Sequence, residues 1–423
     1  MVFEWVFGAP VGRFNNPGAA GQNPRDMKTE LNQFAKPARR GETQPSRVPG
    51  SRPCRVGGPC LPSQTCRGCP KSKPASNPDL IELVVAPENA VAIAADLLGV
   101  TRGHRFILDR DAREIQTLVR KILAAHLPVE TLERIQAFGT GTAEPVLVLR
   151  GLPQQESIPP SPYRGFGDDS KTAVADLLLL GVYAVAGIEP VSFAFENNGF
   201  LFRNVTPVIG AAGEKSSQGY DVELGWHTDN PCGPFELAIG ETMARLAKAR
   251  SAIPTFLGFT GLRNADAEGR PIPTRILPMR RVVQRLEPWV NAGLRLNEFQ
   301  VNPPASNATS PLVGVPLLEQ GHGGDLLRFN GDPKQVFGLT PLAKESLEAL
   351  KAMAAKSEDD VLSLAVGLGT VMAFDNRRVA HMRSAFNPGT DLAQARWMRR
   401  CYGYFDASSG RFVDPGHWPN LRK

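Results

Sequence analysis

The sequence of 423 residues predicts an α+β protein, with a core of short β-strands arranged as a β-sandwich or jelly roll and helices that flank it. Two observations support this fold class. Many short apolar runs are separated by Gly and Pro turns, and most stretches with helical periodicity precede them. A change of composition at Asp79 further predicts that a tail precedes the folded domain.

Residues 1–78 have the composition of a disordered segment. They hold 12 Lys and Arg against 4 Asp and Glu, a net charge of +8, so the rest of the chain is close to neutral. They also hold 12 Pro and 9 Gly. Such a segment buries too little apolar surface to offset the entropy lost on ordering. We therefore expect a disordered basic tail over 1–78 and a folded domain over 79–423.

Apolar residues recur at helical spacing in four segments of the domain. We expect helices at residues 88–99, 110–126, 170–186 and 341–356. Thr340 is placed to cap the last of them, and Pro341 fits its first turn.

Shorter apolar runs bounded by Gly, Pro and polar residues predict the strands of the core. We expect them at residues 146–150, 191–195, 200–206, 255–262, 325–329, 361–366, 371–375 and 399–405.

Four of the six cysteines lie in the tail: Cys54, Cys60, Cys66 and Cys69. The last two have the C-x-x-C spacing of a zinc knuckle, but the other spacings are longer and no His is nearby. We expect free thiols there, and the pattern does not resemble the disulfide framework of a secreted protein.

Several classes of protein are disfavoured. No run of about 18 apolar residues exists, so no membrane-spanning helix is expected. The N-terminus lacks the basic stretch and long apolar run of a secretory signal, which favours a cytoplasmic protein. A nucleic-acid-binding protein acting through its tail is an alternative, but the charges are scattered and aromatic residues for base stacking are scarce. We expect neither nucleic acid nor membrane as a partner.

Three residues form a candidate metal site. His227 and Asp229 are two residues apart, so on an extended segment their side chains point to the same side. His381 follows about 150 residues later, a short turn after an apolar strand. Two His and one carboxylate, with open coordination positions, are the ligand set of non-haem Fe(II) oxygenases.

Two arginines follow the second His. Arg396 and Arg400 are four residues apart, so both project to one side of a strand. A guanidinium binds a carboxylate with two parallel hydrogen bonds. The pair therefore fits a site that holds two carboxylate-bearing molecules beside a metal.

These motifs together resemble the clavaminate synthase-like Fe(II)/2-oxoglutarate-dependent oxygenases, the amino-acid hydroxylase branch of the taurine dioxygenase superfamily. The resemblance covers roughly residues 80–407, and it implies a double-stranded β-helix form of the jelly roll. The matching stretches are HTD at 227–229, FDNRR at 374–378, HMRSAF at 381–386, RWMRR at 396–400, FLFRNVTPV at 200–208 and LGFTGLRN at 257–264.

The resemblance implies a role for each matching residue. His227, Asp229 and His381 would bind Fe(II). Arg396 would pair with the distal carboxylate of 2-oxoglutarate, and Thr274 would add a contact to it. Three residues would bind the substrate: Arg400 its carboxylate, and Asn330 and Asp332 its polar end.

The resemblance implies hydroxylation of a free polar L-amino acid of the asparagine, arginine or lysine type, with O₂ as co-substrate and succinate and CO₂ as products. Halogenating relatives lack the carboxylate ligand, so Asp229 argues against halogenation. One alternative within this class stays open: an oxygenase that hydroxylates, desaturates or cyclises a larger natural-product intermediate. The amino acid, the carbon oxidised and the oligomeric state are not indicated.

A Gly- and Ser-rich loop at residues 209–221 directly precedes the first His. Its position and composition predict a lid that closes over the substrate.

Overall fold

The computed structural model describes residues 77–103, 112–164, 172–193, 200–233, 235, 253–303, 311–405 and 420–421. Its contacts divide the chain into two units, Met1–Ser72 and Lys73–Lys423, and all described residues belong to the second. Apart from Asn77 and Pro78, the predicted tail with its four cysteines lies outside the described residues.

The larger sheet has eight strands in the order β1-β2-β14-β6-β16-β3-β17, with β4 paired to β16. All pairs are antiparallel except β1 with β2 and β17 with β3. The strands are β1 (Leu80–Val84), β2 (Val146–Arg150), β3 (Glu189–Phe193), β4 (Arg203–Val205), β6 (Phe256–Arg263), β14 (Val371–Asp375), β16 (Trp397–Tyr404) and β17 (Asn420–Leu421).

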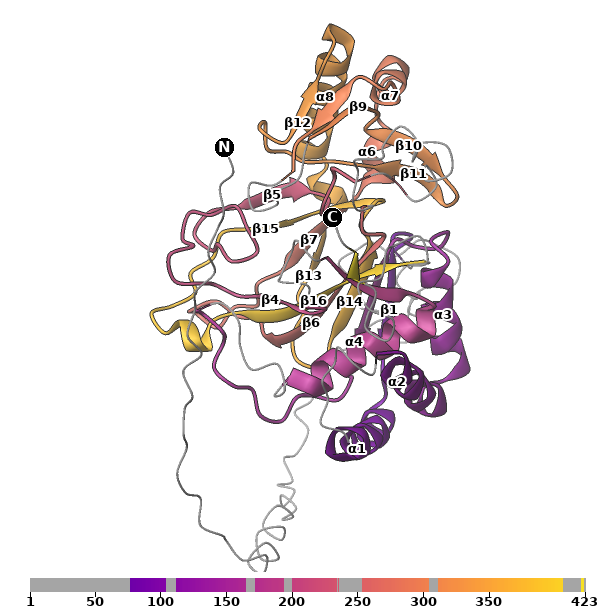
Figure 1. The fold of residues 1–423 in the computed structure, drawn as a ribbon, viewed down its shortest axis with the longest axis vertical. Helices are drawn as coiled ribbons and strands as arrows, with labels where there is room; N and C mark the ends of the chain where they lie inside the picture. The colour runs from indigo at the N-terminus through magenta and orange to yellow at the C-terminus, as the bar shows by residue number, and fades with distance from the viewer. Residues whose placement is uncertain are drawn as a thin grey trace, which may run out of the picture. The chain divides into compact units, whose positions relative to one another are not determined.

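Four helices cover one face of this sheet: α1 (Pro87–Gly103), α2 (Ala112–His126), α3 (Val129–Gly139) and α4 (Ala173–Ala186) (Figure 1). Helix α4 contacts β6 and β16, and α2 packs on α4. Nearly every residue of α4 is buried, which explains its apolar sequence. Successive side chains of a strand alternate between faces, so Leu147 and Ala373 join this helical core.

The second sheet has four strands in the order β13-β7-β15-β5. It packs against the other face of the larger sheet, since Val148 and Phe374 share one apolar core with Ile276 and Val379. Its strands are β5 (Leu224–His227), β7 (Thr274–Pro278), β13 (Leu362–Leu364) and β15 (Val379–Arg383). The fold is therefore a mixed helix and sheet structure with two facing sheets.

A smaller substructure surrounds a third core (Figure 1). It contains two small sheets, β12-β8-β9 and β10-β11, and helices α7 and α8 pack on each other. Its elements are α6 (Met279–Val283), α7 (Pro288–Leu294), β8 (Phe299–Val301), β9 (Leu312–Val315), β10 (Leu318–Gly321), β11 (Gly324–Leu327), β12 (Val336–Gly338) and α8 (Pro341–Ala355). Two 3₁₀ turns, Glu358–Asp360 and Leu392–Gln394, precede β13 and β16.

Most predicted elements are confirmed with shifted ends. Strands 146–150 and 371–375 are found at their predicted bounds. The cap of α8 is also confirmed, because Oγ1 of Thr340 accepts a 3.2 Å hydrogen bond from the backbone N–H of Ala343. Of the predicted strand 200–206, only β4 pairs with a neighbouring strand. Leu201 and Phe202, which precede β4, are buried in the core without belonging to a strand.

Other elements were not predicted. Helix α3 was not expected, nor were β1 and the four strands β7 to β10 between residues 264 and 324. Within the described residues, no helix is both long and apolar enough to cross a membrane.

Candidate active site

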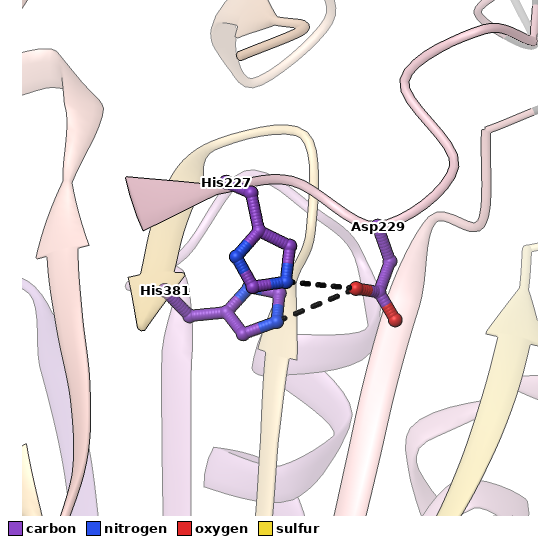
Figure 2. A group of neighbouring side chains, drawn as sticks. All are labelled: His227, Asp229 and His381. Carbon is purple, nitrogen blue, oxygen red and sulfur yellow. Dashed lines mark ion pairs between the residues drawn. The ribbon is translucent and has the colours of Figure 1, made fainter. Parts of the chain in front are cut away.

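Two histidines and an aspartate meet where β5 and β15 pair. His227 and His381 are register partners in this antiparallel pair, with ring centroids 4.2 Å apart. Asp229 lies two residues beyond His227, and its Oδ1 is 3.3 Å from Nε2 of His227 and 3.5 Å from Nε2 of His381 (Figure 2). The structure thus brings together the three residues predicted as metal ligands.

The two imidazoles present the same nitrogen to the carboxylate. Nδ1 of His227 donates a 2.8 Å hydrogen bond to the carbonyl of Gly225, which leaves Nε2 as the nitrogen with a free lone pair. Burial, together with the neighbouring His227, lowers the pKa of His381 to about 4. His381 is therefore neutral at neutral pH, which is the form that binds a metal.

The backbone of Asp229 is held by Asn376. The side-chain oxygen of Asn376 accepts a 2.7 Å bond from the N–H of Asp229, and its Nδ2 donates to the carbonyls of Asp229 and Pro254, both at 3.0 Å. The next residue, Asn230, has φ 49°, a left-handed conformation that Asn tolerates.

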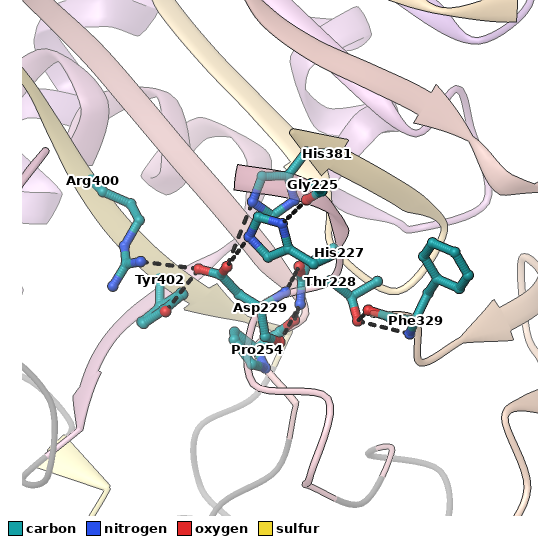
Figure 3. Close-up of polar contacts among 10 residues, drawn as sticks. Gly225, His227, Thr228, Asp229, Pro254, Phe329, His381, Arg400 and Tyr402 are labelled. Atoms are coloured by element: carbon teal, nitrogen blue, oxygen red, sulfur yellow. Dashed lines mark hydrogen bonds and ion pairs between the residues drawn. The ribbon is translucent and has the colours of Figure 1, made fainter. Parts of the chain in front are cut away.

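The preceding residue is anchored on the other side. The N–H of Thr228 donates to the carbonyl of Phe329 at 2.8 Å, and its hydroxyl accepts from the N–H of Phe329 at 3.1 Å (Figure 3). The segment that carries His227 and Asp229 is therefore fixed from both sides.

The two oxygens of Asp229 have different partners. Oδ1 faces the histidines, whereas Oδ2 accepts from Nη1 of Arg400 at 3.0 Å and from the hydroxyl of Tyr402 at 2.9 Å (Figure 3). Burial alone would raise the pKa of Asp229, but Arg400 and both histidines together lower it well below its usual value. The carboxylate is therefore ionised, with one oxygen directed at the histidines.

These donors fit one metal ion. The candidate ligand atoms of His227, Asp229 and His381 all lie within 4.8 Å of one another. Two ligand atoms at right angles on an ion, each about 2.1 Å from it, are about 3 Å apart, close to the separations seen here. Two imidazoles and one carboxylate on one side of the ion leave further coordination positions open, as in Fe(II) oxygenases.

A cavity of about 700 Å³ opens beside these residues, and Arg396 and Thr274 line it. Arg396 is buried without any carboxylate partner among the described residues; its Nε donates to Asn264 at 3.0 Å. Burial and the nearby charge of Arg383 lower its pKa to about 9. The buried Oγ1 of Thr274 also has no hydrogen-bond partner in the described structure. A buried guanidinium that contacts no carboxylate in the described structure, next to a hydroxyl without a hydrogen-bond partner there, suits a small carboxylate ligand.

Arg400 lines the same cavity, as the four-residue spacing from Arg396 predicted. Arg399, between them, faces the opposite side of β16, where its guanidinium forms two 2.9 Å bonds with the buried carboxylate of Asp176 on α4. Arg399 thus serves the packing of α4 on the sheet, while Arg396 and Arg400 face the cavity.

Asn330 and Asp332 also line the cavity. Asn330 forms an isolated β-bridge with His227, so the segment lies directly beside the metal ligands. Lys215, from the predicted lid, contacts Asp332 and lines the cavity too.

Sequence reasoning missed three residues of the site. Asn376 directly follows the buried strand β14, and a polar residue at that point was the available signal. Tyr402 stands two residues after Arg400, so strand alternation could have placed it in the cavity. Arg383 also lines the cavity and donates to the carbonyls of Tyr220 and Val222.

Comparisons with known proteins agree with this architecture. The family described as "Taurine catabolism dioxygenase TauD, TfdA family" matches residues 295–402. An L-lysine 3-hydroxylase from Catenulispora acidiphila is 25% identical over 300 residues, which cover 69% of this chain and 76% of the relative. An L-asparagine oxygenase from Streptomyces coelicolor is 28% identical over 276 residues, covering 64% of this chain and 74% of the relative.

Solved structures share the fold. A structure of asparagine oxygenase in complex with Fe(II), 2S,3S-3-hydroxyasparagine and succinate has a TM-score of 0.66 and 22% identity, covering 81% of this chain and 99% of that one. A structure of the non-heme iron oxygenase OrfP with Fe and alpha-ketoglutaric acid has a TM-score of 0.62 and 21% identity, covering 78% of this chain and 96% of that one. The resemblance stated from the sequence is confirmed to this extent: residues 295–402 match the TauD/TfdA dioxygenase family, and relatives named as amino-acid hydroxylases align with about two thirds of the chain.

Proposed function

We propose that this protein hydroxylates a free polar L-amino acid, using Fe(II), 2-oxoglutarate and O₂ and releasing succinate and CO₂. The observation that carries the proposal is the convergence of His227, Asp229 and His381 beside a cavity that Arg396 and Arg400 also line. The relatives named as hydroxylases of lysine, asparagine and enduracididine support an amino-acid substrate.

In this proposal, His227, Asp229 and His381 hold the iron. Arg396 and Thr274 bind the distal carboxylate of 2-oxoglutarate, which places its other end toward the metal. When bound, the iron and 2-oxoglutarate supply the oxidising power needed to attack an unactivated C–H bond. The chain contributes orientation of the reactants and exclusion of water.

Three residues would orient the amino acid. Arg400 pairs with its carboxylate, and Asn330 and Asp332 contact its polar end. Since Arg400 also contacts Oδ2 of Asp229 at 3.0 Å, it would place the substrate carboxylate next to the metal ligands. The bound substrate would then lie between the metal site and the segment 330–332.

We also propose a fold type, domain bounds, a lid and a cellular location for this protein. The two facing sheets would form the double-stranded β-helix of this superfamily, with a basic Pro- and Gly-rich tail over residues 1–78 and the oxygenase domain over 79–423. We further propose that the loop 209–221 is a lid and that the enzyme acts in the cytoplasm.

A panel of amino acids tests the function. The enzyme with Fe(II), 2-oxoglutarate and ascorbate should release succinate with at least one polar L-amino acid and yield a product heavier by one oxygen. Turnover with a sulfonate or a betaine, but with no amino acid, would overturn the substrate class. Full activity of the variant His381→Ala would overturn the metal assignment.

The cavity volume of about 700 Å³ favours one further candidate, a larger substrate derived from an amino acid. Such a substrate could be hydroxylated, desaturated or cyclised at the same metal. Product mass separates these outcomes, because desaturation or ring closure removes two hydrogens and hydroxylation adds one oxygen.

A further inference from the structure

The side chain of Lys215 reaches across the cavity wall to Asp332. Its Nζ lies 3.3 Å from Oδ2 of Asp332, and both residues line the cavity. The two residues are 117 positions apart in the sequence, so the contact joins the loop 209–221 to the segment beside the metal ligands.

Both oxygens of Asp332 are already engaged. Oδ2 faces Lys215, and Oδ1 accepts a 2.9 Å hydrogen bond from the backbone N–H of Lys334. A carboxylate that would otherwise attract a cationic side chain is therefore neutralised by the protein itself.

Asn330 adds a second donor at this end of the cavity. Its Oδ1 accepts a 2.8 Å bond from the N–H of Asp332, which directs the acceptor half of the amide at the backbone. Its Nδ2 makes no hydrogen bond within the described residues, so the half of the amide available to a ligand is the donor half. The segment is held in place because the N–H of Gly331 donates to the carbonyl of Trp226 at 2.9 Å.

The charged residues around the cavity also disfavour a cationic ligand. Its lining contains six basic residues: Arg203, Lys215, Lys351, Arg383, Arg396 and Arg400. Among the described residues, three acidic ones line it: Glu223, Asp229 and Asp332. An Fe(II) ion and a 2-oxoglutarate dianion would cancel each other, so the excess of positive charge would remain when the substrate enters.

We propose that Lys215 is a specificity-determining residue. It makes the enzyme prefer amino acids whose side chain ends in a hydrogen-bond-accepting oxygen, as in an amide or a carboxylate, over amino acids whose side chain ends in a cation. The inference rests on the proposed function and narrows its substrate class. The ammonium of Lys215 and the amide Nδ2 of Asn330 donate to the acceptor, and Lys215 repels a guanidinium or ammonium.

Steady-state rates with single amino acids test this. The full chain with Fe(II), 2-oxoglutarate and O₂ is assayed with L-asparagine, L-glutamine, L-aspartate and L-glutamate, and with L-arginine, L-lysine and L-ornithine. We expect the best acceptor-ended substrate to exceed the best cationic one at least tenfold in kcat/KM. Calorimetric titration without O₂ should give the same order of dissociation constants.

Substitution of Lys215 separates its charge from its bulk. Lys215→Met should lower the preference at least tenfold, by raising KM for the acceptor-ended substrate and lowering it for the cationic ones. Lys215→Arg should keep the preference. The control is Lys334→Met, which removes a nearby positive charge but keeps the backbone N–H that bonds Asp332.

Two results would overturn the inference about Lys215 but leave the proposed function standing. One is a wild-type preference for arginine, lysine or ornithine, and the other is an equal substrate preference of Lys215→Met and Lys334→Met. Absence of turnover with every amino acid would overturn the proposed function, and the inference with it.

Discussion

The hydroxyl of Tyr402 donates a 2.9 Å hydrogen bond to Oδ2 of Asp229, on the side of the carboxylate that does not face the histidines. Arg400 reaches the same oxygen at 3.0 Å. With Oδ2 engaged twice, Oδ1 is the oxygen available to a metal, and the carboxylate can bind through that single atom. Tyr402 and Arg400 therefore set the orientation of the ligand as well as its charge.

Tyr402→Phe should weaken binding of Fe(II) about tenfold, because partners that orient a metal ligand typically contribute 10–100-fold to affinity. The measurement is a metal titration of the metal-free protein under anaerobic conditions. Tyr183→Phe is the control, since it also removes a buried hydroxyl next to β16, one that donates to the carbonyl of Cys401. Equal metal affinities of the two variants would contradict the role of Tyr402.

Asn376→Ala should weaken metal binding and also destabilise the fold by about 3 kcal/mol. The substitution removes three hydrogen bonds and leaves buried backbone groups of Asp229 and Pro254 without partners. Chemical denaturation measures the stability, and the metal titration measures the site. Asn387→Ala, at an exposed asparagine, should change neither, and an unaltered Asn376→Ala protein would show that Asp229 is held by other contacts.

Sequence patterns predicted the elements whose signal is local. Strand β2 is buried almost throughout, so VLVLR stands out as a continuous apolar run. Helix α8 carries both a cap at Thr340 and a proline in its first turn. The triad was predicted because its residues occur in a known motif order. Helix α3 has only 11 residues and no side-chain cap, and it was missed.

The missing parts of the site depend on contacts between distant segments. Asn376 joins Asp229 and Pro254, which precede it by 147 and 122 residues. No spacing in the sequence indicates such a contact before the strands are assembled. The contact of Lys215 with Asp332 could not be predicted for the same reason.

Replacing Arg396 or Arg399 by Gln should affect two different properties, ligand binding in the first case and stability in the second. Arg396→Gln should raise the dissociation constant of 2-oxoglutarate at least tenfold, because a charged hydrogen-bond donor is lost, without lowering stability, because no buried acid loses its partner. Arg399→Gln should destabilise the protein by about 3–5 kcal/mol, since it leaves the fully buried Asp176 without its ion pair. Denaturation curves and ligand titrations of both variants check this, and a common loss of stability would contradict the unpaired state of Arg396.

The stability of the metal-free protein should fall as the pH is lowered from about 6.5 to 4. The folded pKa of His381 is about 4, whereas its ordinary value is 6.5, so in this window the unfolded chain binds a proton that the folded site does not. The stability present above pH 6.5 is therefore lost progressively, by on the order of 3 kcal/mol. The lowered pKa of Asp229 acts in the same direction below its ordinary value of 3.8. Urea denaturation across this range should show a smaller loss for His381→Gln than for the wild type, and parallel curves would contradict the buried, neutral state of His381.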